Sequence, residues 1–104
     1  MAWEIEYLPQ ACDDLKKLDH SVRVQVLKAI VKVSENPLPQ SQGGLGKPLG
    51  NHQSLKLSGY LKIKLLKIGI RVVYRLVYNP CKMKIVVISA RNNDEVYKIA
   101  NFRH

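Results

Sequence analysis

Three strand-like runs follow one another in the second half of this 104-residue chain, and only short turns separate them. They cover roughly residues 55–66, 70–78 and 83–90, and the connections "KIG" and "NPCK" contain strong turn formers. Connections this short join neighbouring antiparallel strands, because a parallel pair needs a crossover of about a dozen or more residues. The second half therefore predicts a three-stranded antiparallel sheet. The continuous apolar run "KIVVIS" predicts a central strand that is covered on both faces.

The first half of the chain supplies one strand and two helices. Apolar and acidic residues alternate in "WEIEYL", which is typical of a half-buried strand. Apolar residues then recur at helical spacing in residues 8–18 and 22–33, with Pro9 opening the first helix and Ser21 as the predicted N-cap of the second. The short link between the helices predicts a hairpin whose apolar faces pack on a sheet.

The elements occur in the order β-α-α-β-β-β, and "NDEVYKIANF" predicts a short terminal helix. We therefore expect an α+β fold in which the two-helix hairpin packs on one face of an antiparallel sheet. The length predicts a single domain over residues 1–104. We interpret the stretch "NPLPQSQGGLGKPLGNHQ" as a connector, because Ser41 and Pro48 break the P-loop pattern and Leu49 breaks the dinucleotide-binding pattern.

Targeting signals and cysteine spacing limit the class of protein. No apolar run reaches the roughly 18 residues of a membrane span, and Met1 leads into "AWEIEYL" rather than into a signal peptide. We therefore expect a cytoplasmic location. Cys12 and Cys81 show neither CxxC spacing nor a neighbouring His pair, so we expect reduced thiols, no metal site and no cofactor.

The net charge of +9 lies entirely in the second half of the chain. Residues 1–52 contain six Lys or Arg and six Asp or Glu, whereas residues 53–104 contain eleven Lys or Arg and two acidic residues, Asp94 and Glu95. Such a concentrated positive field suits a polyanionic partner: nucleic acid, an anionic membrane surface or an acidic protein. A surface selected only for solubility is less favoured, because it would not require this segregation.

Five of these cations lie in "LKIKLLKIGIRVVYRLVY", residues 61–78, where the other residues belong in a core. Because side chains alternate along a strand, Lys62 and Lys64 point to the same face. Arg91 follows the third strand, and we expect it to converge with these two lysines and Arg71 on one exposed side of the sheet. The remaining cations are interpreted as separate solvated charges at a sheet edge: Lys67, Arg75, Lys82 and Lys84.

A cluster of like charges favours one kind of chemistry. Neighbouring cations lower the pKa of a lysine, because they disfavour its ammonium form, and the lysine can then act as a general base. The other cations can stabilise a pentavalent phosphate transition state. This set suffices to cleave RNA through its own 2′-OH without a metal ion, a reaction that DNA cannot undergo. No Ser-His-Asp arrangement competes, since His20, His52 and His104 fall in a helix linker, a loop and the last position.

Four segments carry a resemblance to a known family: "GKPLG", "YLKIKL", "GIRVVYRLVY" and "VVISARNNDEVY". In this order they resemble the RelE/ParE superfamily of bacterial type II toxins, over nearly the whole chain. The lysine pair and the terminal arginine and tyrosine are similar to the RelE-like branch rather than to ParE. The resemblance implies a ribosome-dependent endoribonuclease that cuts mRNA in the A site through the 2′-OH. It also implies the ribosome, mRNA and a cognate antitoxin as partners, with no membrane and no small-molecule cofactor.

The resemblance implies a role for five residues of this chain. Lys62 and Lys64 would supply the general base and its electrostatic support, in either order. Arg71 would hold the phosphate and stabilise its transition state. Arg91 would add charge and protonate the leaving 5′ oxygen, and Tyr97 would stack on or orient the nucleotide.

Two alternatives use the same fold. A ParE-like inhibitor of DNA gyrase would act on a protein and would not require the four cations together, so their presence counts against it. A non-catalytic RNA- or ribosome-binding domain would use the same cations only to contact phosphates. Both the enzyme and this binding domain would depend on salt in the same way, so only the chemistry of the RNA products separates them.

Overall fold

The computed structural model describes residues 3–48, 60–78, 80–90, 98–100 and 102–103, and every structural statement below concerns this part of the chain. Its helices are α1 (Pro9–Lys16) and α2 (His20–Ser34), followed by the short 3₁₀ helix η1 (Gln40–Gln42). Residues 98–100 and 102–103 are also helical. The strands are β1 (Glu4–Tyr7), β2 (Lys47–Pro48), β3 (Tyr60–Leu65), β4 (Ile70–Tyr78) and β5 (Cys81–Ser89).

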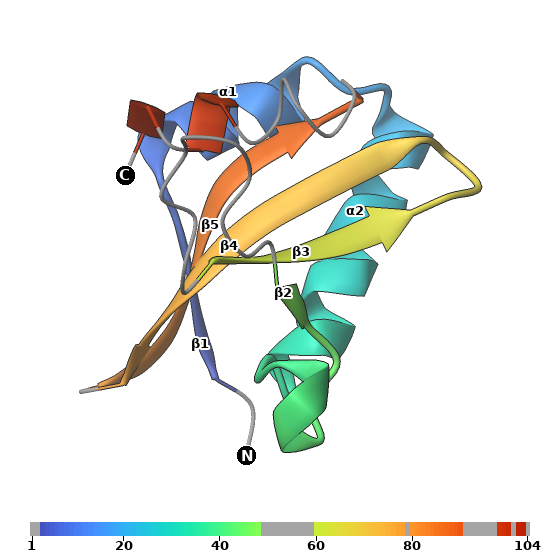
Figure 1. Ribbon diagram of the computed structural model, residues 1–104. Coiled ribbons are helices and arrows are strands. Elements are labelled where there is room, and N and C mark those ends of the chain that lie inside the picture. The colour runs from blue at the N-terminus through green and yellow to red at the C-terminus, as the bar shows by residue number, and fades with distance from the viewer. Residues whose placement is uncertain (1–2, 49–59, 79, 91–97, 101, 104) are drawn as a thin grey trace.

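The five strands form one sheet in the order β1-β5-β4-β3-β2 (Figure 1). Strands β2 to β5 pair antiparallel, as the short turns predict, whereas β1 adds to β5 in parallel. The parallel pair departs from the purely antiparallel sheet that we expected. It arises because most of the chain separates β1 from β5, so no short turn dictates their direction. The α+β class and the order of the predicted elements are confirmed, and β2 is an additional strand.

The turns and a bulge set which side chains share a face. The turn between β3 and β4 covers residues 66–69 and ends at Gly69, whose φ of 65° lies in the left-handed region that glycine adopts without strain. The register of β4 and β5 shifts between Val73 and Tyr74. This bulge explains why two consecutive β5 residues, Val86 and Val87, belong to the same apolar cluster. Residues 55–59 of the predicted first strand lie outside the described residues.

The two helices meet at a tight link that a side chain of α2 stabilises. Helix α1 begins at Pro9 as predicted, but the N-cap of α2 is Asp19 rather than Ser21. The Arg23 guanidinium donates hydrogen bonds of 3.0 Å to the carbonyl oxygens of Leu15 and Leu18, which ties the first turn of α2 to the end of α1. Helix α2 begins at His20, two residues earlier than the predicted N-cap at Ser21 implies. In the described residues, no helix has the length and apolar character needed to cross a bilayer.

Both helices pack on one face of the sheet (Figure 1). Ala11 of α1 and Ile30 of α2 are buried there in one cluster with Tyr74 of β4. The opposite face carries a second cluster, in which Val87 of β5 packs with Ala100 near the C-terminus. Strand β5 is thus covered on both faces, as its continuous apolar run predicts.

The connector between α2 and β3 contains the short strand β2, and contacts with buried residues of β3 and β4 hold this part of the connector in place. Tyr74, fully buried on β4, donates a hydrogen bond of 2.8 Å from its hydroxyl to the carbonyl oxygen of Pro37. Gly46 packs so closely against Tyr74 and Leu61 that a Cβ at this position would collide with both. Lys47 follows directly and opens β2. The sequence did not reveal this strand, because two residues show no alternation that could be detected.

Candidate functional site

The register of three neighbouring strands brings four cations to one face of the sheet. Lys47 of β2 lies opposite Lys62 of β3, and Lys64 of β3 lies opposite Arg71 of β4. Directly opposed residues point to the same face, and so do residues two apart on one strand. We call these four residues the cationic face; it lies on the side of the sheet away from α1 and α2. Lys47 is exposed, and the other three are half-buried.

Three of the four members are residues that strand alternation predicted to share a face: Lys62, Lys64 and Arg71. Lys47 is a member that the sequence analysis did not single out, although it stands in the quoted segment "GKPLG". Its position depends on the pairing of β2 with β3, and this pairing cannot be derived from alternation. The only sequence feature that pointed to Lys47 was its place in "GKPLG", shortly before the lysine-containing strand "YLKIKL".

The cationic face changes the acid–base properties of Lys64. The charge of Lys62 is the largest cause that lowers the pKa of Lys64, followed by partial burial and then by the charges of Arg71 and Lys47. The direction agrees with the prediction that neighbouring cations disfavour the ammonium form. A lowered pKa increases the neutral fraction of Lys64 at a given pH, and only the neutral amine can accept a proton.

A buried tyrosine lies next to the cationic face. Tyr60 precedes Lys62 by two residues on β3, so its side chain points to the same face, and its register partner on β4 is Arg75. Burial raises the pKa of the Tyr60 hydroxyl, and the charge of Arg75 opposes this shift. Tyr60 belongs to the apolar cluster with Val73 and Val87, so this cluster borders the cations. The sequence analysis did not identify Tyr60 as a neighbour of the site.

The strand order corrects our interpretation of three other cations as sheet-edge charges. Arg75 lies on β4, in the middle of the sheet, and Lys82 and Lys84 lie on β5, between β1 and β4. Lys82 forms an ion pair of 3.6 Å with Glu6 of β1, and Lys84 lies opposite Glu6 in the register. Glu6 of β1 therefore lies near both lysines of β5, and Lys84 also lies opposite Arg75 of β4. The edge interpretation was wrong because strand order cannot be derived from the pattern of one strand.

The two remaining predicted site residues, Arg91 and Tyr97, lie outside the described residues. The described chain stops at Ala90, directly after β5, and resumes at Lys98. Ala90 and Lys98 both line one cavity of about 720 Å³, which lies between α1, the end of β5 and the helical residues near the C-terminus. The roles of Arg91 and Tyr97 therefore stay predictions.

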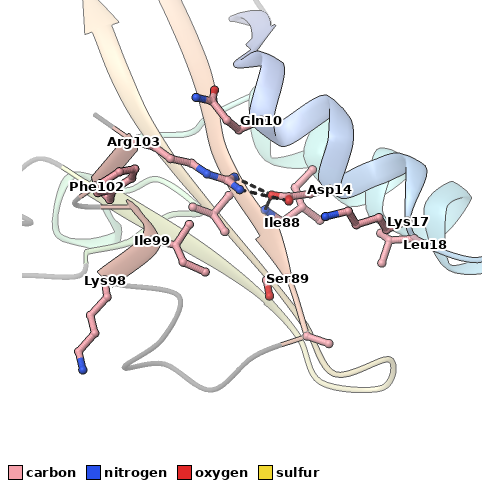
Figure 2. Close-up of a pocket in the computed structure, with 12 residues that line it drawn as sticks. Gln10, Asp14, Lys17, Leu18, Ile88, Ser89, Lys98, Ile99, Phe102 and Arg103 are labelled. Carbon is pink, nitrogen blue, oxygen red and sulfur yellow. Dashed lines mark hydrogen bonds and ion pairs between the residues drawn. The ribbon is translucent and has the colours of Figure 1, made fainter.

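A charged pair fixes the last described residues against α1 and β5. Figure 2 shows the Arg103 guanidinium pointing at the Asp14 carboxylate, with nitrogen–oxygen distances of 2.7 and 3.3 Å. Arg103 also donates to the carbonyl oxygen of Val86 at 2.9 Å, and the backbone N–H of Ile88 donates to Asp14 at 3.1 Å. The pair thus connects the C-terminus, α1 and β5. In the described residues, no group of three or more His, Cys, Asp or Glu side chains could hold a metal ion.

We expect Asp14→Ala to lower the free energy of unfolding by about 2–4 kcal/mol, because it leaves a half-buried guanidinium and a backbone N–H without their acceptor. The two side chains are only 13% and 17% exposed, so solvent weakens their interaction little. Urea denaturation of the purified protein measures the change. Asp13→Ala is the matched control, since Asp13 is exposed on the same helix and should change stability by less than about 0.5 kcal/mol. Equal losses in both variants would contradict the role of the pair.

Comparison with known proteins finds a likeness to RelE toxins over nearly the whole chain. No family model matches the sequence. A RelE-like toxin protein of Escherichia coli is 26% identical over 106 residues, covering 99% of this chain and 98% of that protein. The mRNA interferase toxin RelE of Escherichia coli K12 is 28% identical, over 96% of this chain and 95% of that protein.

Solved structures show the same likeness in three dimensions. A variant of Escherichia coli toxin RelE in which two arginines are replaced by alanine, solved in the free state, superimposes with a TM-score of 0.75. The identity is 25%, over 99% of this chain and 98% of that one. The isolated Escherichia coli RelE toxin gives a TM-score of 0.70 at 26% identity, with 98% of each chain covered. The chain is thus similar to RelE toxins in sequence and in fold. The predicted RelE-like fold is thereby confirmed.

One further solved relative contains a partner. The RelE variant in complex with a peptide of the antitoxin RelB matches with a TM-score of 0.69 at 25% identity, over 96% of this chain and 95% of that one.

Proposed function

We propose that this RelE-like chain is the toxin of a type II toxin–antitoxin system and inhibits translation as an endoribonuclease. It would cut mRNA in the ribosomal A site, in the cytoplasm, through attack of the 2′-OH. The mRNA interferase activity named for the Escherichia coli relative supports the reaction class. The observation that carries the proposal is the cationic face, where Lys64, with its lowered pKa, lies opposite Arg71.

The proposed reaction begins with a proton transfer. Neutral Lys64 accepts the proton of the 2′-OH, and the resulting oxygen attacks the adjacent phosphorus. Arg71 binds the phosphate with its planar guanidinium and, together with Lys62, stabilises the additional negative charge of the pentavalent transition state. The bond from phosphorus to the 5′ oxygen then breaks, leaving a 2′,3′-cyclic phosphate and a 5′-hydroxyl end. The lowered pKa of Lys64 supports its assignment as the base.

Arg91 and Tyr97 complete the proposed site, although the structure does not describe their positions. Arg91 would protonate the leaving 5′ oxygen, and Tyr97 would stack on the nucleotide and orient it. Because the charges that stabilise the transition state would come from the protein itself, the proposed step uses no metal ion held by the protein.

The proposed protein partner is a cognate antitoxin of RelB type. The solved RelE variant with an antitoxin RelB peptide supports this partner. An acidic or amphipathic segment that covered the cationic face would neutralise its charges and block access of RNA. A ParE-like action on DNA gyrase is not favoured by the relatives, which are named RelE.

A translation assay tests the nuclease directly. Purified protein is added to translating ribosomes with a defined mRNA, and the 5′ ends are mapped by primer extension. We expect cuts at A-site codons with the wild-type protein and none with the Lys62→Ala/Lys64→Ala variant. Lys67→Ala is the matched control, because Lys67 is an exposed lysine in the turn that follows β3. Intact mRNA with the wild-type protein would exclude the nuclease and favour a domain that only binds.

A further inference from the structure

The cationic face contains two pairs of cations, one after the other along β3. Lys47 and Lys62 form the first cross-strand pair, and Lys64 and Arg71 form the second. Directly opposed residues in a sheet have Cβ atoms about 4.5–5.5 Å apart. Residues two apart on a strand are separated by about 6.6 Å. This separation is close to the repeat of phosphates along an extended single strand of nucleic acid.

We propose that Lys47 binds a second RNA phosphate, next to the phosphate that Lys64 and Arg71 hold, with Lys62 between the two. This inference rests on the proposed function, because it extends the same face by one nucleotide. Two phosphates bound in succession would fix the direction and register of the RNA, which one phosphate cannot do. Lys47 thereby positions the substrate without taking part in the proton transfers.

The local structure keeps Lys47 at a defined place. Its backbone pairs with β3, and the preceding Gly46 lies against Tyr74 and Leu61. Tyr74 in turn holds the start of the connector through its hydrogen bond to Pro37. Lys47 is exposed, so its ammonium group is free to reach a ligand above the sheet. Such a fixed backbone and accessible charge are what a binding residue requires.

The distribution of charge over the sheet supports bound anions at this place. Like charges directly opposite each other destabilise a sheet. On β3 both lysines lie opposite other cations in the register, and on β5 Lys84 lies opposite both Glu6 of β1 and Arg75 of β4. Two phosphates would offset the repulsion within the two pairs. The charge of Lys47 also contributes to the lowered pKa of Lys64, so the second phosphate site is coupled electrostatically to the proposed base.

Short uncleavable RNA analogues test this proposal without any cleavage. The ligands are a 2′-O-methyl dinucleotide with one phosphate and the corresponding trinucleotide with two, titrated into the full chain and followed by NMR or calorimetry. We expect the wild-type protein to bind the trinucleotide about three- to tenfold more tightly. In Lys47→Gln this preference should fall to about twofold or less, while dinucleotide affinity changes by no more than about twofold.

Two further variants separate charge from structure. Lys47→Arg keeps the charge and should retain the preference for the trinucleotide, whereas Lys67→Gln should leave both affinities unchanged. The proposal is overturned if the wild-type protein shows no preference, if Lys47→Gln keeps it, or if that variant weakens both ligands equally. A preference that depends on Lys47 together with uncut mRNA would overturn the nuclease alone. Cut mRNA together with a preference independent of Lys47 would overturn the second phosphate site alone.

Discussion

Arg71→Ala should lower the rate of mRNA cleavage by about 10²- to 10³-fold, whereas Arg75→Ala should lower it only a few-fold. Both arginines lie on β4 and point to the same face, but their neighbours differ. Arg71 is opposite Lys64, the proposed base, while Arg75 is opposite Tyr60. Four residues along a strand correspond to about 13 Å, which is too far for both guanidinium groups to bind one phosphate. The expected difference therefore follows from the register.

Single-turnover cleavage on ribosomes programmed with one mRNA measures this difference, because it excludes product release. Arg71→Lys separates charge from geometry: it keeps the positive charge but loses the planar fork, so its activity should lie between those of the wild-type protein and Arg71→Ala. Thermal unfolding of each variant verifies that the sheet is intact. Equal losses for Arg71→Ala and Arg75→Ala would mean that the scissile phosphate does not lie at the Lys64 end of the cationic face.

The parts of the fold that the sequence predicted are those with local signals. Alternation has a period of two, so it placed Lys62 and Lys64 on one face before any strand pairing was known. Short turns made β3, β4 and β5 antiparallel neighbours, which brought Arg71 opposite Lys64. The direction of the pKa shift of Lys64 followed from this proximity. These inferences needed only the properties of single elements and of adjacent ones.

The parts that the sequence did not predict depend on contacts between distant segments. The pairing of Lys47 with Lys62 requires a two-residue strand, which has no pattern of its own. The ion pair between Asp14 and Arg103 joins residues at opposite ends of the chain, and many other pairs of Asp and Arg were equally compatible with the sequence. The parallel pairing of β1 with β5 likewise joins the start of the chain to its last strand. Only the folded chain selects among such pairings.

The pH dependence of cleavage should report on Lys62 as well as on Lys64. A general base must be neutral to accept a proton, so the rate should rise with pH until the pKa of Lys64 is passed. Lys62 is the largest cause that lowers this pKa. Lys62→Gln removes that charge, so the pKa of Lys64 rises and the rising limb of the pH–rate profile moves to higher pH. At neutral pH the variant should therefore lose activity, and part of the loss should return as the pH is raised.

The same measurement on Lys64→Arg tests the assignment of the base itself. Arginine stays protonated, so this variant should lose about 10²- to 10⁴-fold in rate and should not recover at alkaline pH. Lys47→Gln should move the limb in the same direction as Lys62→Gln but by less, because Lys47 is the smallest of the named causes. Lys67→Gln should leave the limb in place. Two outcomes would assign the proton transfer to a group other than Lys64. The first is a rising limb of the pH–rate profile that does not move in Lys62→Gln, and the second is a rising limb that persists in Lys64→Arg.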